Sequence, residues 1–202
     1  PRTSSAWATF IELPTPTPPT GPLPTIFISE FLADPEVVSD SNGEWIELYN
    51  AGAVPVNLNN WAIADLGTDH YTITGELLIP AGGYVVLGRN GDSSLNGGVQ
   101  VDLVYTKFSM ANSADEILLL APDGREADRV VWGDALVPAS GKSLERTNFS
   151  GAAQWVNATM AWPGSSGDLG TPASDYQPPV QTPTPPLGPL PPIYISEFLA
   201  DP

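Results

Sequence analysis

Short apolar runs alternate with turn signals along most of this chain, and no segment carries apolar residues at helical spacing. Residues 44–49 show the pattern best, because Ile46 and Leu48 fall on one face of an extended segment and Glu47 on the other. The pattern predicts strands at Ile26–Leu32, Glu44–Tyr49, Trp61–Ala64, His70–Ile73, Tyr84–Gly88, Val101–Tyr105, Glu116–Leu120 and Arg129–Trp132, with two weaker ones at Ser143–Arg146 and Gln154–Asn157.

Glycine- and proline-containing turns separate these runs. Pro122-Asp123-Gly124 lies between two predicted strands and is a strong hairpin signal. About nine short strands with regular turns predict an all-β fold, most simply a β-sandwich. We expect Trp45, Trp61 and Trp132, which lie in strand runs, to pack in its core.

Proline-rich segments flank the predicted sandwich, which we place at residues 26–176. Residues 14–25 contain six prolines and residues 177–192 contain eight, so both segments are predicted to be stiff linkers of polyproline type. Thr15, Thr17, Thr182 and Thr184 lie between these prolines and give the linkers the composition of an O-glycosylated stalk. A plain stiff linker without glycans fits the same composition.

One segment occurs twice. Residues 15–35 and 182–202 differ at three of 21 positions, with an offset of 167 residues, so a linker and a following strand recur. A domain that stopped at this strand would lack its partners, and a chain starting at Pro1 does not begin at a native translation start. We therefore expect one unit of a tandem array, or a subunit that lends a strand to its neighbour.

The two ends of the chain hold the candidate assembly residues. Residues 1–13 do not match the segment one period later, and their strand-like run is either the end of a preceding domain or a donor strand. Residues 193–202 are the first strand of a next repeat or a donated strand. The apolar residues expected to make these contacts are Trp7, Phe10, Ile11, Ile193, Ile195 and Phe198.

Charge and composition exclude several classes of function. The net charge is −16, which would repel phosphate backbones and argues against nucleic-acid binding. No apolar run is long enough to span a membrane. The chain has no cysteine and one histidine, His70. Gly141-Lys142-Ser143 resembles the end of a phosphate-binding loop, but position 136, where the motif requires a glycine, is Leu136. We therefore expect a protein that is not an enzyme and needs no cofactor, calcium aside.

A calcium site is one interpretation of the segment after the first predicted strand. Asp34, Asp40, Asn42 and Glu44 supply hard oxygen ligands within eleven residues, around a loop that contains glycine. The alternative is a solvated turn in which these side chains cap the backbone.

Two further sets of residues are candidates for ligands or modification. Trp155 and Trp162 lie in an irregular region and could form a sugar-binding platform, contact a neighbouring subunit, or simply pack. Asn148 and Asn157 occur in motifs that match the N-glycosylation acceptor.

Several motifs together resemble the lamin-tail domain family over roughly residues 26–150. These are ISEFLADP, GEWIELYNAG, VNLNNWAIAD, LLIPAGGYVVLGRN, DEILLLAPDGREADRVVWG and GKSLER, in this order. The resemblance implies an immunoglobulin-like β-sandwich that acts in binding and architecture without a catalytic site. The Pro/Thr linkers resemble those of bacterial secreted and surface members. Without a coiled-coil rod, the chain does not inherit the nuclear filament role.

Our leading hypothesis is a structural repeat of an extracellular surface protein or filament, assembled through tandem or strand-donating sandwich units. It expects an extracellular or cell-surface location and self-association. The alternative is an accessory module that binds carbohydrate or cell wall for a secreted protein, with glycans as its partners.

Overall fold

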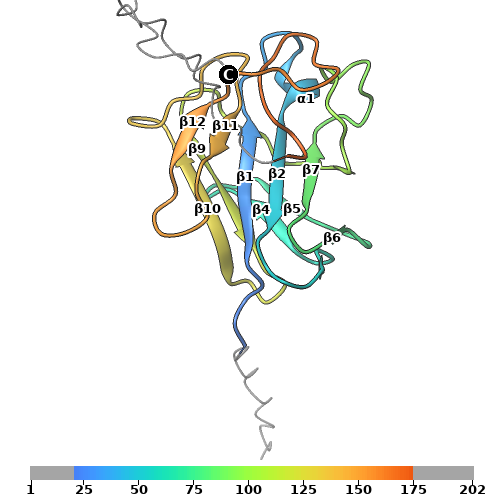
Figure 1. Ribbon diagram of the computed structural model, residues 1–202, viewed down its shortest axis with the longest axis vertical. Coiled ribbons are helices and arrows are strands. Elements are labelled where there is room, and N and C mark those ends of the chain that lie inside the picture. Colours follow the sequence, from blue (N-terminus) through green and yellow to red (C-terminus); the bar gives the residue numbers. More distant parts are fainter. Residues whose placement is uncertain (1–20, 175–202) are drawn as a thin grey trace, which may run out of the picture.

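The structure is a computed structural model that describes residues 21–174. Within this range, a six-stranded and a four-stranded β-sheet pack face to face (Figure 1). The larger sheet has the order β12-β11-β1-β2-β7-β8 and the smaller sheet the order β10-β9-β4-β5. The elements are β1 (Ile26–Leu32), α1 (Asp40–Gly43), β2 (Trp45–Asn50), β3 (Val56–Asn57), β4 (Ala62–Ala64), β5 (His70–Thr72), β6 (Leu78–Ile79), β7 (Tyr84–Gly88), β8 (Leu103–Val104), β9 (Asp115–Leu120), β10 (Glu126–Trp132), β11 (Leu144–Arg146) and β12 (Trp155–Asn157).

The prediction of an all-β sandwich is confirmed, and each of the ten predicted strands overlaps a strand of the structure. The β9–β10 hairpin turns at Gly124, whose φ of +82° suits glycine and whose N–H donates to the Ala121 carbonyl at 2.9 Å. The sequence pattern missed the paired strands β3 and β6 and the helix α1. Two-residue strands and a single helical turn are too short to show a period.

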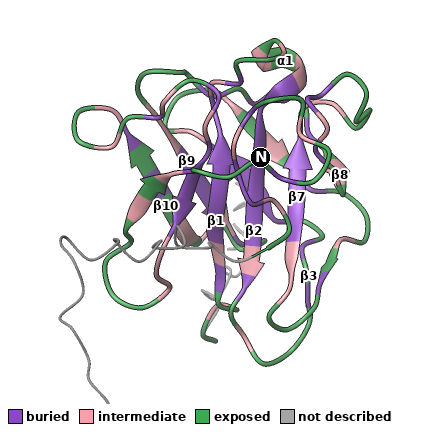
Figure 2. Ribbon diagram, turned by 45° about the horizontal axis from the view of Figure 1, so that its top comes forward, coloured by how far each residue is buried: buried purple, intermediate pink, exposed green. Residues whose placement is uncertain are grey.

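Strand β1 lies inside the six-stranded sheet rather than at its edge. It pairs antiparallel with β2 on one side and with β11 on the other, and its register with β2 shifts between Ile28 and Glu30. Figure 2 shows β1 and β2 coloured as buried over most of their lengths. The first strand of the domain is therefore completed by strands that come later in the chain, up to residue 146.

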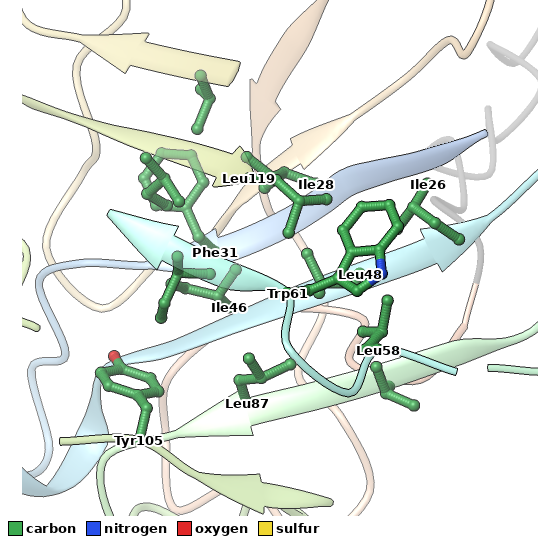
Figure 3. Close-up of a cluster of buried hydrophobic side chains, with 14 of the residues drawn as sticks. Ile26, Ile28, Phe31, Ile46, Leu48, Leu58, Trp61, Leu87, Tyr105 and Leu119 are labelled. Carbon is green, nitrogen blue, oxygen red and sulfur yellow. The ribbon is translucent and has the colours of Figure 1, made fainter. Parts of the chain in front are cut away.

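The core fills the space between the two sheets (Figure 3). Ile26, Ile28 and Phe31 of β1 point into it and are at most 1% exposed. Phe31 packs against Trp132 of the opposite sheet, with ring centroids 4.7 Å apart. Burial of such side chains stabilises the fold by roughly 1.5–3 kcal/mol each, so β1 is a main contributor to the core. Trp61 and Trp132 lie in this core, as predicted. Trp45, predicted to join them, is instead buried in a second apolar cluster.

Contacts with the sandwich begin before β1. Leu23 packs against the core, and Arg125 donates a hydrogen bond of 2.8 Å to the Gly21 carbonyl. The Ala51 N–H donates to the Thr25 carbonyl at 2.9 Å. The last residues of the first predicted linker are therefore held on the domain.

The predictions on residues 1–20 and 175–202 lie outside the described residues. They concern most of both linkers, with Thr15, Thr17, Thr182 and Thr184, and the terminal segments. The candidate assembly residues Trp7, Phe10, Ile11, Ile193, Ile195 and Phe198 belong to the same undescribed ranges.

Candidate functional site

The outer face of the six-stranded sheet carries three bands of side chains, and strand β2 contributes Trp45, Glu47 and Tyr49, one to each band. The register of the sheet aligns each of them with residues of neighbouring strands. The apolar band consists of Leu32, Trp45, Val86, Val99 and Trp162, the carboxylate band of Glu30, Glu47 and Glu145, and the aromatic band of Phe27, Tyr49, Tyr84 and Phe149.

Residues 162–174, here called the C-terminal cover, lie over the first two bands. Figure 1 shows this segment, in orange to red, passing in front of the upper end of β2. At its start Trp162 packs edge-on against Trp45, with ring centroids 6.0 Å apart. Further along, the Ser143 N–H donates a hydrogen bond of 3.0 Å to the Leu169 carbonyl. A Cβ on Gly170 would lie 2.7 Å from Oε1 of Glu30, so glycine allows the cover to approach this closely.

Three hydroxyl and amide groups hold the carboxylate band. Ser143 Oγ donates to Oε1 of Glu30 at 2.5 Å, and the Thr171 N–H donates to the same oxygen at 2.8 Å. The Thr171 hydroxyl lies 3.1 Å from Oε2 of Glu30 and 2.9 Å from Oε1 of Glu145. Glu30 and Glu145 are 2% and 3% exposed, so these bonds replace their hydration.

A threonine hydroxyl has a single hydrogen and cannot donate fully to both carboxyl groups, so this contact favours a proton on one of them. Burial raises the pKa of Glu30 to about 8, and the nearby charge of Glu145 raises it further against the lowering effect of the hydrogen bonds. Burial therefore favours the protonated form of Glu30 at neutral pH, beside the Thr171 hydroxyl that also contacts Glu145.

Glu47 completes the carboxylate band. Ser29 Oγ donates to its Oε1 at 2.7 Å, and the Ala173 N–H donates to its Oε2. A cavity of about 10 Å³ remains beside the three carboxyl groups, which is room for about one water molecule. The sequence predicted that Glu47 faces away from the side of the strand that carries Ile46 and Leu48, and this is confirmed. The face that carries Glu47 is covered by residues 162–174 rather than solvated. The band fastens the cover to the sheet.

The aromatic band lies beyond the cover and is half-buried among the described residues. Phe27, Tyr49 and Tyr84 form a row across β1, β2 and β7, in which Tyr49 and Tyr84 stack at 4.7 Å. Phe149 joins the row at 4.7 Å from Tyr49 and 5.5 Å from Phe27. The Arg146 guanidinium lies 4.5 Å from the Phe27 ring centroid, a cation–π contact. This is the largest set of clustered aromatic rings on the outer face within residues 21–174.

Sequence reasoning did not identify this band. Its members lie up to 122 residues apart. Strand register aligns Phe27, Tyr49 and Tyr84, and the segment after β11 brings Phe149 beside them. The available signal was the alternation of aromatic residues with buried aliphatic ones in the first and second predicted strands.

The structure does not bring the predicted calcium ligands together. Oδ1 of Asp34 accepts a hydrogen bond from Asn112 at 2.9 Å, Asp40 lies in α1, and Oδ1 of Asn42 accepts from Asn90 at 3.0 Å. Among residues 21–174, no group of three or more His, Cys, Asp or Glu side chains is arranged to hold a metal ion. Calcium binding stays a prediction, which a lower melting temperature after chelation would support.

Glu44, the fourth predicted ligand, has protein partners instead. Its Oε2 accepts from Arg89 at 3.3 Å and from the Met110 N–H at 3.2 Å. Burial raises the pKa of Glu44 to about 7, although Arg89 opposes the shift. The side chain therefore joins the loops at one end of the sandwich.

The predicted tryptophan platform is packed rather than open. Trp162, at the start of the cover, is 7% exposed and packs on Trp45, and Trp155 is half-buried with its ring 5.7 Å from Phe31. Both predicted N-glycosylation acceptors use their side-chain amides in hydrogen bonds: Asn148 donates to the Ala152 carbonyl at 3.1 Å, and Asn157, the last residue of β12, donates to the Val137 carbonyl at 3.3 Å. A glycan on either nitrogen would compete with that hydrogen bond.

Comparison with known proteins gives one family. The sequence model described as Lamin Tail Domain matches residues 19–134, more than half of the chain. No curated protein matches the chain. The match ends before β11 and β12, yet β11 pairs directly with β1, so residues after 134 complete the sheet. No helix within residues 21–174 has the length and apolar character needed to cross a membrane.

Proposed function

We propose that this chain, which belongs to the lamin tail domain family, is an architectural repeat of an extracellular surface protein or filament. Successive immunoglobulin-like sandwiches are joined through Pro/Thr linkers. The family is a structural one, and Glu30, the carboxyl group with the highest pKa, bonds the chain's own cover, which supports a role without catalysis.

The observation that carries the proposal is the place of β1 in the sheet. Residues 193–199 repeat this strand, so Ile193, Ile195 and Phe198 correspond to Ile26, Ile28 and Phe31. The last three are fully buried core residues. Glu197 repeats Glu30, a buried carboxyl group that needs hydroxyl partners from elsewhere in the same sandwich. The second copy is therefore suited to the centre of another such domain.

The position of β1 inside the sheet favours covalent tandem repeats over strand donation. Strands added by a neighbour pair with a free sheet edge. In the described domain the edges of the two main sheets are β12, β8, β10 and β5, whereas β1 has partners on both sides and its place is already filled. A second β1 fits the next domain of the array better than the edge of a neighbour.

A chimera tests the proposal directly. Residues 36–176 are joined after Pro202, so that residues 193–202 begin a second sandwich in native register. We expect two folded units, with an unfolding enthalpy about twice that of the 202-residue chain and a two-lobed shape in small-angle X-ray scattering. The control carries Phe198→Ser, which should unfold the second unit alone. One folded unit with an unstructured extension in the unmodified chimera would refute the tandem proposal.

Strand donation makes a different prediction for the 202-residue chain by itself. Donated strands would produce concentration-dependent oligomers in sedimentation velocity, abolished by deletion of residues 1–13 or by Phe198→Ser. The tandem proposal expects a monomer in all three proteins.

The location and the linker glycans are separate elements of the proposal. Mass spectrometry of protein from its native source would show hexose-containing additions at Thr15, Thr17, Thr182 or Thr184 if the linkers are glycosylated stalks. Unmodified threonines would restrict the linkers to a spacer role.

A further inference from the structure

We propose that the proline-rich segment at residues 177–186 docks on the aromatic band of its own domain and thereby fixes the direction in which the next domain leaves. The occupant belongs to this chain, and the surface is the row Phe27, Tyr49 and Tyr84 with Phe149. The inference adds an interaction surface to the proposed tandem array, although the docking itself does not require a second domain.

The path of the C-terminal cover is the first argument. The cover crosses the outer face band by band: Trp162 contacts Trp45 of the apolar band, and Thr171 then bonds Glu30 of the carboxylate band. Ala173 bonds Glu47, and Ser174 lines the same small cavity as Tyr84 and Phe149. The described chain thus ends at the border of the third band.

The chemistry of the following residues is the second argument. Residues 177–186 read QPPVQTPTPP, with five prolines in ten positions and no charge. Extended proline-rich segments bind to surfaces lined by aromatic side chains, because their preformed helix loses little entropy on binding. The carboxylate band would not suit such a segment, but a half-buried aromatic row does.

The dimensions agree with this assignment. The aromatic row crosses three adjacent strands, which lie about 4.8 Å apart, so its length is roughly 10 Å. A polyproline helix rises about 3.1 Å per residue, and three to four residues therefore cross the row. Pro178 and Pro179 follow Ser174 closely enough to reach Tyr84 first.

The internal repeat gives an independent indication. One of the three differences between the two copies is Phe27 against Tyr194, so the position on the aromatic band keeps an aromatic ring in the second copy. A domain that begins at residue 193 would thus carry the same kind of docking position for its own linker.

The decisive measurement is backbone relaxation by NMR on the full 202-residue chain. Docking predicts order parameters of about 0.8 for Val180, Gln181 and Thr182, against values below about 0.6 for a flexible chain. A variant with Pro178, Pro179 and Pro183 replaced by serine should lose this order and shift the ring resonances of Tyr49 and Tyr84. Values below about 0.6 in the unmodified chain would overturn the proposal.

A matched control separates this occupant from the others. Replacement of Pro14, Pro16 and Pro18 by serine changes the first linker equally and should leave both tyrosine resonances in place. If this control shifts them and the first variant does not, the first linker is the occupant and the proposal is wrong. The docking proposal is also wrong if added oligosaccharides shift the ring resonances of Tyr49 and Tyr84 while the replacement of Pro178, Pro179 and Pro183 leaves these resonances unchanged.

The two proposals can fail separately. A chimera that folds as two units beside a flexible residue 177–186 segment would refute docking and keep the tandem array. An ordered segment in a chain whose chimera forms one unit would refute the array and keep docking.

Discussion

Glu30→Gln is the most informative single substitution, because it fixes the neutral form of a buried carboxyl group. The pKa of Glu30 is about 8 in the fold against 4.5 for an ordinary glutamate. The folded protein therefore holds this proton more tightly than the unfolded chain does. The contribution to stability is complete below about pH 4.5 and is lost as the pH rises through about 8.

The magnitude follows from these two values. Between pH 5.5 and 8.5, the linkage relation gives a loss of about 3 kcal/mol in the free energy of unfolding from Glu30 alone. This is a large share of the roughly 5–15 kcal/mol that stabilises a typical domain. Glu44, whose pKa is raised to about 7, also lowers the free energy of unfolding as the pH rises. It contributes equally to the pH dependence of the wild type and of Glu30→Gln.

The assay is urea unfolding of the full chain at several pH values, followed by tryptophan fluorescence. The amide of the variant keeps an oxygen that accepts from Ser143 and gains an N–H that can donate to Thr171, so the variant should fold. Between pH 5.5 and 8.5, its free energy of unfolding should fall by about 3 kcal/mol less than that of the wild type. The matched control Glu76→Gln changes an exposed side chain and should keep the wild-type slope. Equal slopes in Glu30→Gln and wild type would refute the assignment of the proton to Glu30.

Three further substitutions test the contacts described above, each by urea unfolding. Thr171→Val removes the hydroxyl shared by two buried carboxyl groups and should cost about 1–3 kcal/mol, with Thr171→Ser as the control that restores the bridge; equal costs would contradict a hydroxyl role. Phe31→Ala should cost about 3–5 kcal/mol because it empties the centre of the core, whereas Phe31→Leu should cost clearly less; a cost below about 1 kcal/mol for alanine would contradict the packing. Gly98→Ala places a Cβ 1.9 Å from the Gly164 carbonyl oxygen, at a residue whose φ is +93°. Its cost should be well above the roughly 1–2 kcal/mol expected for the control Gly75→Ala, where φ is +88° but the space around the Cβ is open. Similar costs for the two variants would show that the close approach at Gly98 is absent.

The sequence by itself determined the longer strands and the class of fold, although it missed the two-residue strands β3 and β6. Alternation of Ile46 and Leu48 with Glu47 has a period of two, which is a property of neighbouring residues and needs no partner strand to be recognised. The turn at Gly124 is equally local, since it depends on the φ of one residue. The ordered motifs were sufficient to indicate the lamin-tail family, and the repeat of residues 15–35 indicated a repeated unit without any structure.

Only the tertiary structure decided which face of each strand is covered and by what. A period of two separates Glu47 from Ile46 but cannot show that residues 162–174 return to cover the glutamate. The hydrogen bond between Thr171 and Glu30 joins positions 141 residues apart, and the aromatic band depends on the register of three strands. The pKa of Glu30 has the same origin, because desolvation comes from the atoms that surround a group in space, whereas sequence patterns report only its neighbours along the chain.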